Sequence, residues 1–147
     1  MGNNLIAQFN YFDTMARAQK GYARLLEPIC KKWDLTRNEL DVILFLANNP
    51  EYDRASDISV HRGMAKSHVS LSVASLEEKG LLRRRGNVHD RRAVHLELTG
   101  DAHEIATQGQ AAQNGFYSAI FAGLTREEMA FWSGITRKVS DNISRMD

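Results

Sequence analysis

The stretch Ala65–Thr99, AKSHVSLSVASLEEKGLLRRRGNVHDRRAVHLELT, decides the fold. Its first half has apolar residues at helical spacing as far as Gly80, so it predicts a short amphipathic helix over 66–79. Its second half predicts a β-hairpin, because apolar and polar side chains alternate in the segment 93–98. A short helix over 54–62, joined to the next by a turn at Gly63, completes the pattern. Together these elements predict a winged helix-turn-helix.

The helical spacing and the strand alternation also predict which side chains face the protein core. In the helix, Val69, Val73 and Leu76 share one side and leave the front half of the opposite side to solvent or to a groove. In the second strand, the inward set is predicted to be Val94, Leu96 and Leu98, and the outward set Ala93, His95 and Glu97.

Positive charge is concentrated in the predicted wing. From Lys79 to Arg92 the sequence has six basic residues and one acidic residue, a formal charge of +5, whereas the whole chain carries +1. Duplex DNA favours such a cluster, because each neutralised phosphate releases condensed counterions. The arginines at 83–85 alone fit a solvated strand edge equally well. The adjoining helix-turn-helix favours DNA.

Long helices are predicted on both sides of this region. The first covers 5–32, and Pro28 is expected to kink or end it. Capping boxes at 36–39 and 125–128 begin the second and the last helix, and a further helix covers about 101–122. The fold class is therefore mainly α with a small β-hairpin wing (α+β). We expect a single domain over 1–147, with a DNA-binding lobe at 36–99 and dimerisation helices at 5–32 and 101–146, because these helices have more apolar surface than one winged helix covers.

Composition limits the function classes. The chain has 147 residues, 43% hydrophobic and 25% charged, which is typical of a globular protein. One cysteine excludes an intrachain disulfide and a cysteine-based zinc cluster, and the histidines have no His-x-x-x-His spacing. No apolar run is long enough for a membrane span, and no signal peptide is evident. We expect a cytoplasmic protein with no metal, cofactor or membrane partner. Enzyme motifs such as a phosphate-binding glycine loop are absent, so we expect no enzymatic activity.

The order of these elements resembles the multiple-antibiotic-resistance regulator (MarR) family. The most specific part is Asp90-x-Arg92 in the wing, followed at fixed spacing by Leu98-Thr99. The resemblance covers nearly the whole chain. It implies a dimeric transcription regulator whose recognition helices enter successive major grooves while the wings touch the backbone or the minor groove. Many members release DNA when a small aromatic or other effector binds.

The resemblance implies DNA contacts at Ser67, His68, Ser70 and Arg92, and a structural role in the wing for Asp90. The sequence departs from the family pattern at Ala65, where a Ser or Thr cap is usual, and at Leu71, which is often basic. Leu71 suits a thymine methyl group instead. The full set expected to contact DNA is Arg54, Lys66, Ser67, His68, Ser70, Leu71, Ser72, Arg83, Arg85, His89, Arg91 and Arg92.

The sequence also raises hypotheses about an effector site and a redox site. A group of large, mostly aromatic side chains is expected either to line an effector pocket or to fill the core where the first two helices meet. These residues are Tyr11, Phe12, Met15, Tyr22, Trp33 and Phe45. Cys30 suggests a redox switch if Lys31 and Lys32 lower its pKa. The peroxide-sensing branch of the family, however, carries its cysteine near the start of the first helix, so the position does not match.

The sequence thus predicts a homodimeric, sequence-specific regulator of double-stranded DNA, more specifically a repressor that a small molecule releases from a pseudo-palindromic operator. Its half-sites are expected about 34–36 Å apart. The alternatives are a winged-helix module that docks a protein and a small-molecule-binding protein without DNA binding. Charge favours the first interpretation, because neither alternative needs a basic wing.

Overall fold

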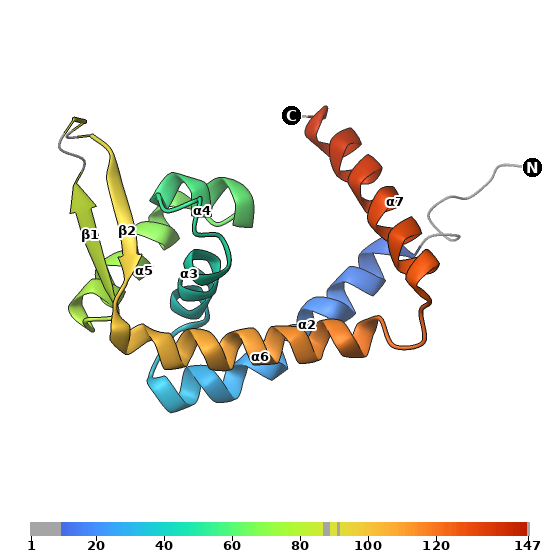
Figure 1. Cartoon of the computed structure of the whole chain (residues 1–147), viewed down its shortest axis with the longest axis horizontal. Coiled ribbons are helices and arrows are strands. Elements are labelled where there is room, and N and C mark those ends of the chain that lie inside the picture. Colours follow the sequence, from blue (N-terminus) through green and yellow to red (C-terminus); the bar gives the residue numbers. More distant parts are fainter. Residues whose placement is uncertain (1–9, 87–88, 91, 147) are drawn as a thin grey trace, which may run out of the picture. The chain divides into compact units, whose positions relative to one another are not determined.

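The computed structural model of the protein describes residues 10–86, 89–90 and 92–146. Its elements, in chain order, are α2 (Tyr11–Trp33), α3 (Arg37–Asn48), α4 (Ala55–Arg62), α5 (Lys66–Glu78), β1 (Leu82–Gly86), β2 (Val94–Leu98), the 3₁₀ turn η1 (Gly100–Ala102), α6 (His103–Ile120) and α7 (Arg126–Ser144) (Figure 1). This mainly helical fold with one hairpin confirms the predicted fold class. No described helix is long and apolar enough to cross a membrane.

The chain divides into two compact units, residues 1–113 and 114–147, and the boundary lies within α6. The first unit contains the core, which is built around α3. Leu40, Ile43 and Leu44 of this helix are fully buried and pack in one cluster with apolar residues of α5 and the hairpin. Burial of each such side chain contributes about 1.5–3 kcal/mol. This core holds α5 and the wing on one scaffold.

The predicted helix starts are confirmed by their caps. The hydroxyl of Thr36 accepts a hydrogen bond from the Glu39 N–H (3.2 Å), and the Glu39 carboxylate accepts one from the Thr36 N–H (2.8 Å). Thr125 and Glu128 form the same reciprocal pair at the start of α7. Gly63 has a φ of +63°, the left-handed conformation that a tight turn between α4 and α5 requires and that glycine adopts at low cost.

Helix α2 continues through Pro28, which is expected either to kink or to end it, and its last residue lies one position beyond the predicted range 5–32. It continues to Trp33, and Asp34 then ends it in a left-handed conformation with φ of +52°. A proline inside a helix removes one backbone hydrogen bond. Here Leu26 and Ile29, on either side of Pro28, are buried in the core. Their packing favours continuation of the helix despite the missing bond.

The hairpin is antiparallel, with Leu82 opposite Leu98 and Gly86 opposite Val94. Leu96 is buried as predicted, but the rest of the alternation is less regular. Ala93, expected on the outer face, is only 5% exposed, and Val94, expected inward, is exposed. Ala93 precedes β2, and its N–H donates to the Asp90 carbonyl (3.1 Å). Ala93 therefore belongs to a turn, and the alternation of inward and outward side chains begins only after it, in β2.

In the second unit, none of the described residues of α7 is buried. Its stripe of apolar side chains nevertheless has helical spacing and is exposed along its whole length: Met129, Trp132, Ile135, Val139 and Ile143. Met146 is exposed as well and lies just beyond the end of the helix. The chain by itself therefore leaves this stripe facing solvent.

Candidate nucleic-acid interface

The exposed face of α5 contains most of the residues predicted to contact DNA. Lys66, Ser67, His68, Ser70 and Leu71 are all exposed, whereas Val69, Val73 and Leu76 are buried as predicted. Ala65 precedes the helix without a side-chain capping bond. The first backbone N–H groups of α5 are thus available to solvent or to a phosphate oxygen.

Ser72 is the exception, and its prediction as a DNA contact is wrong. Its side chain is only 5% exposed. Position 72 lies three residues after Val69 and four before Leu76, so helical geometry puts it on the inward side. A hydroxyl residue near the front of a recognition helix is not enough to predict exposure.

The ammonium group of Lys79, a member of the basic cluster in the sequence, is directed into the protein. Its Nζ donates to the Asp34 carbonyl (2.6 Å) and to the Glu39 carboxylate (3.0 Å). Glu39 is 3% exposed and also accepts a hydrogen bond from the Ser75 hydroxyl. Asp34, Glu39, Ser75 and Lys79 form what we call the Glu39 cluster, which joins the end of α5 to the segment between α2 and α3.

The pKa of Glu39 reflects two opposing effects. Burial raises it, but the hydrogen bonds from Ser75, Thr36 and Lys79, together with the positive charge of Lys79, more than offset this and hold the pKa below its ordinary value. Glu39 is therefore ionised at neutral pH. A buried carboxylate with this many donors restrains the position of α5.

Two wing arginines have acidic partners. The Arg83 guanidinium donates two hydrogen bonds to the Glu97 carboxylate (3.0 and 3.2 Å), and Arg84 donates to Glu77 (3.0 Å). The pairing with Arg83 lowers the pKa of Glu97. Arg85 is exposed, and its side chain has no hydrogen bond to any residue that the structure describes. The formal charge of +5 between Lys79 and Arg92 thus overstates the positive charge that these strands offer to a phosphate.

The wing tip is shaped by Asp90. Its carboxylate accepts a hydrogen bond from the backbone N–H of Arg92 (2.9 Å), as expected of a structural residue, and the Arg92 side chain is exposed. His89 is exposed as well. Arg91 lies outside the described residues, so its predicted DNA contact stays a prediction.

One contact that sequence reasoning missed joins the wing to the helix-turn-helix. The His95 Nδ1 lies 2.8 Å from the Asp53 carboxylate, and the Leu96 N–H donates to the Asp53 carbonyl (2.6 Å). Asp53 directly precedes the exposed Arg54, whose backbone N–H donates to Asp57 (3.0 Å) at the start of α4. The pair spans 42 positions of sequence, so no local pattern indicates it.

The side chains proposed for an effector pocket are not gathered around one cavity. Phe12 is 82% exposed, and its ring contacts Tyr11, whereas Phe45 is buried. Tyr22 accepts a hydrogen bond from Gln113 (2.7 Å), and Trp33 donates one to Gln108 (3.1 Å). Phe45 and Trp33 thus belong to the core or its edge.

A hollow of about 470 Å³ lies instead along α2 and the start of α3. Three of its lining side chains are basic: Lys20, Arg24 and Arg37. Cys30 also lines it, and burial raises the pKa of its thiol, although the nearby Arg37 charge acts in the opposite direction. The suggestion that neighbouring lysines lower this pKa is wrong. Lys31 and Lys32 form ion pairs with Glu27 and Glu104.

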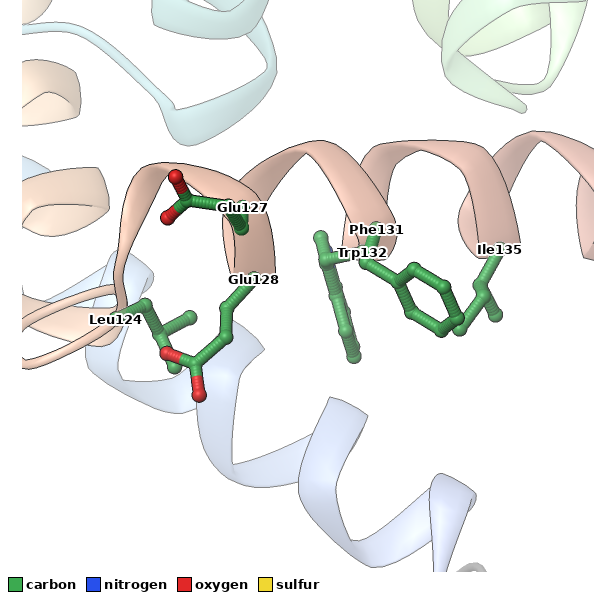
Figure 2. Close-up of a pocket in the computed structure, with 6 residues that line it drawn as sticks. All are labelled: Leu124, Glu127, Glu128, Phe131, Trp132 and Ile135. Carbon is green, nitrogen blue, oxygen red and sulfur yellow. The ribbon is translucent and has the colours of Figure 1, made fainter.

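A second hollow, of about 420 Å³, lies at the start of α7. Figure 2 shows that the rings of Phe131 and Trp132 lie next to each other, with Ile135 further along the helix. Glu127, Glu128 and Leu124 complete the lining. This hollow is mainly apolar and belongs to the exposed face of α7. Among the described residues, no group of three His, Cys, Asp or Glu is placed to hold a metal ion.

These features define a winged helix-turn-helix protein. Residues 33–93 match the model of the MarR family. The transcriptional repressor MprA of Escherichia coli K12 is 27% identical over 92 residues, which are 63% of this chain and 52% of MprA. The chain therefore spans about half the length of the curated relatives that it matches.

Solved structures agree over a larger part of the chain. A MarR-family transcriptional regulator from Silicibacter pomeroyi is 18% identical, with a TM-score of 0.79 and 97% of each chain covered. A Staphylococcus aureus MarR in complex with salicylate and kanamycin is also 18% identical, with a TM-score of 0.74, 98% of this chain and 96% of that chain covered. The predicted resemblance is confirmed, and the fold similarity includes the helices outside residues 33–93.

Proposed function

We propose that the protein is a homodimeric transcription regulator, in more detail a repressor, that binds a pseudo-palindromic site in double-stranded DNA. The observation that carries this proposal is the exposed face of α5, which presents hydroxyl, imidazole and apolar side chains beside a wing whose Asp90 turn exposes Arg92. Short side chains permit close approach to base edges, and arginine at the wing suits phosphate. MprA, the relative named above, is a repressor.

Two properties of α7 support the dimer. Its apolar stripe is exposed along the helix, and contiguous apolar surface of this kind is typical of subunit interfaces. Its charges are also unequally distributed. Its first turn has Glu127 and Glu128 against Arg126, and its second half has Arg137 and Lys138 against Asp141. Antiparallel pairing with a second copy would place opposite charges together, as a two-fold axis permits.

The effector of this proposal is a small anion, and its site is the hollow lined by Lys20, Arg24 and Arg37. Neither Lys20 nor Arg24 forms a side-chain hydrogen bond or ion pair within the described part of the chain, so their charges are available to a ligand. Salicylate, found with the Staphylococcus aureus protein, is an anion of this class. An effector lowers DNA affinity only by its preference for the conformation that does not fit the operator.

Selection from a random duplex library, followed by binding measurements over a series of salt concentrations, tests DNA recognition. We expect Arg92→Ala to weaken binding on all sequences and to lower the slope of log affinity against log salt by about 0.9 for each phosphate that the arginine neutralises. Arg84→Ala is the matched control, because Arg84 is paired with Glu77.

Unchanged affinity and slope in Arg92→Ala would remove Arg92 from the interface. If the library yields no enriched sequence, the protein-docking and ligand-binding alternatives take precedence. Titration of the complex between the protein and the selected duplex with salicylate tests the proposed effector. Release of the DNA supports an anionic effector, and undiminished DNA binding argues against salicylate.

A further inference from the structure

The recognition face of α5 has one large apolar side chain, Leu71, which is 71% exposed. It lies one helical turn after Ser67 and His68, so the three side chains share one face of the helix. Ala74, a turn further along, is also exposed. Leu71 is thus the most protruding apolar group of a face otherwise made of small or polar side chains.

This face has little to offer a phosphate beyond its first turn. Between Lys66 and Glu77, α5 contains no lysine, arginine, aspartate or glutamate. The side chains on the opposite side, Val69, Val73 and Leu76, already fill the core. Leu71 therefore contributes neither charge to the DNA interface nor packing to the fold. Its remaining chemistry is contact with an apolar group outside the chain.

In the major groove of duplex DNA, the apolar group on a base edge is the C5 methyl of thymine. The polar groups of the base edges are hydrogen-bond donors or acceptors, and a leucine placed against them would remove water without replacing its hydrogen bonds. We infer that Leu71 selects a thymine in each operator half-site through contact with this methyl group. The inference rests on the proposed function, because it requires α5 to enter the major groove.

Replacement of thymine by deoxyuridine tests this contact, since it removes only the methyl group and leaves the base pair intact. The probe is the duplex enriched from the random library, with each thymine replaced in turn. We expect wild-type affinity to fall about fourfold for the contacted thymine of each half-site, the effect of one methyl group leaving an apolar contact. Leu71→Ala should bind the thymine and deoxyuridine duplexes equally well.

Two controls keep the result interpretable. Leu71→Ala truncates an exposed side chain of a helix, so its circular dichroism and thermal unfolding should match the wild type. Val60→Ala truncates another exposed apolar side chain, on α4, and should retain the discrimination against deoxyuridine. Equal wild-type binding of both duplexes at every position, or discrimination that persists in Leu71→Ala, would overturn the inference while operator binding stands. Failure to enrich any duplex would overturn the proposed function and this inference together.

Discussion

The helix-turn-helix lobe and helix α7 use apolar residues in opposite ways. In the lobe, Leu40, Ile43, Leu76 and Leu96 are buried by other elements of the same chain. In α7, no described residue is buried, although the spacing of its apolar stripe is equally regular. The same periodicity therefore has two outcomes. It indicates which face of a helix is apolar, but not whether the chain itself or a second copy covers that face.

The two regions also differ in how their polar groups are restrained. Glu39, Ser75 and Lys79 connect distant positions of the lobe through hydrogen bonds. In α7 the capping box and the Ser144 bond to Ser140 are local. Stability of the lobe should thus be a property of the chain, whereas that of α7 should depend on protein concentration.

The largest effect should come from a charge within the α7 stripe. Ile135→Glu places a carboxylate where the proposed partner copy packs, and its burial there would be costly. We expect a monomer in analytical ultracentrifugation. Because a monomer engages one half-site only, affinity for the selected duplex should fall by about 100-fold or more.

Ala130→Glu is the matched control, since it adds the same charge at an exposed position that is neither three nor four residues from any member of the stripe. It should remain a dimer with nearly unchanged DNA affinity. A dimeric Ile135→Glu protein with wild-type affinity would show that α7 is not the interface, and the comparison between the two regions would then need another explanation.

An intermediate effect should come from two glycines of the same helix, α6. A methyl group added at Gly109 would collide with the side chain of Leu44, whereas the space around Gly115 is open. Gly109→Ala should therefore lower the free energy of unfolding by about 1–3 kcal/mol. Gly115→Ala should raise it by about 0.5–1 kcal/mol through helix propensity.

Urea unfolding followed by circular dichroism measures both effects. The penalty at Gly109 should be the same at all protein concentrations, because Gly109 meets Leu44 within one chain. If Gly109→Ala does not lower the free energy of unfolding, Leu44 moves aside freely, and the lobe is less tightly packed than its burial indicates.

Sequence reasoning succeeds where the signal is local. The capping boxes at Thr36 and Thr125, the turn at Gly63 and the buried side of α5 are each specified by a few neighbouring residues. It fails at Ala93, because a turn at Asp90 includes this residue. At Pro28 the sequence leaves open whether the helix is kinked or ended, and the burial of Leu26 and Ile29 favours its continuation to Trp33.

The candidate site is predicted less completely, for a physical reason. The hydrogen bonds of Glu39 with Ser75 and Lys79 span 36 and 40 positions, and the pair of Asp53 with His95 spans 42. Such pairs depend on how the elements pack, so no spacing rule indicates them. For this reason the sequence alone presents Lys79 and Arg83 as charges free to meet DNA, although both have acidic partners.

The last effect, no larger than that at Gly109 and more specific to the lobe, should be the pH dependence that Glu39 confers. Glu39→Gln keeps the shape of the side chain but removes its charge, and at neutral pH it should lower the free energy of unfolding by about 1–3 kcal/mol. The folded-state pKa of Glu39 lies below its ordinary value of 4.5. Its contribution is thus fully present above that value and is lost as pH falls through the folded-state pKa. Urea unfolding from pH 7 to pH 3 should show the free energies of unfolding of the two proteins converging at the acidic end.

Glu97→Gln, which removes an exposed carboxylate paired with Arg83, should have a much smaller effect because solvent screens the pair. A Glu39→Gln penalty that stays constant over this pH range would mean that shape, and not charge, holds α5 in place.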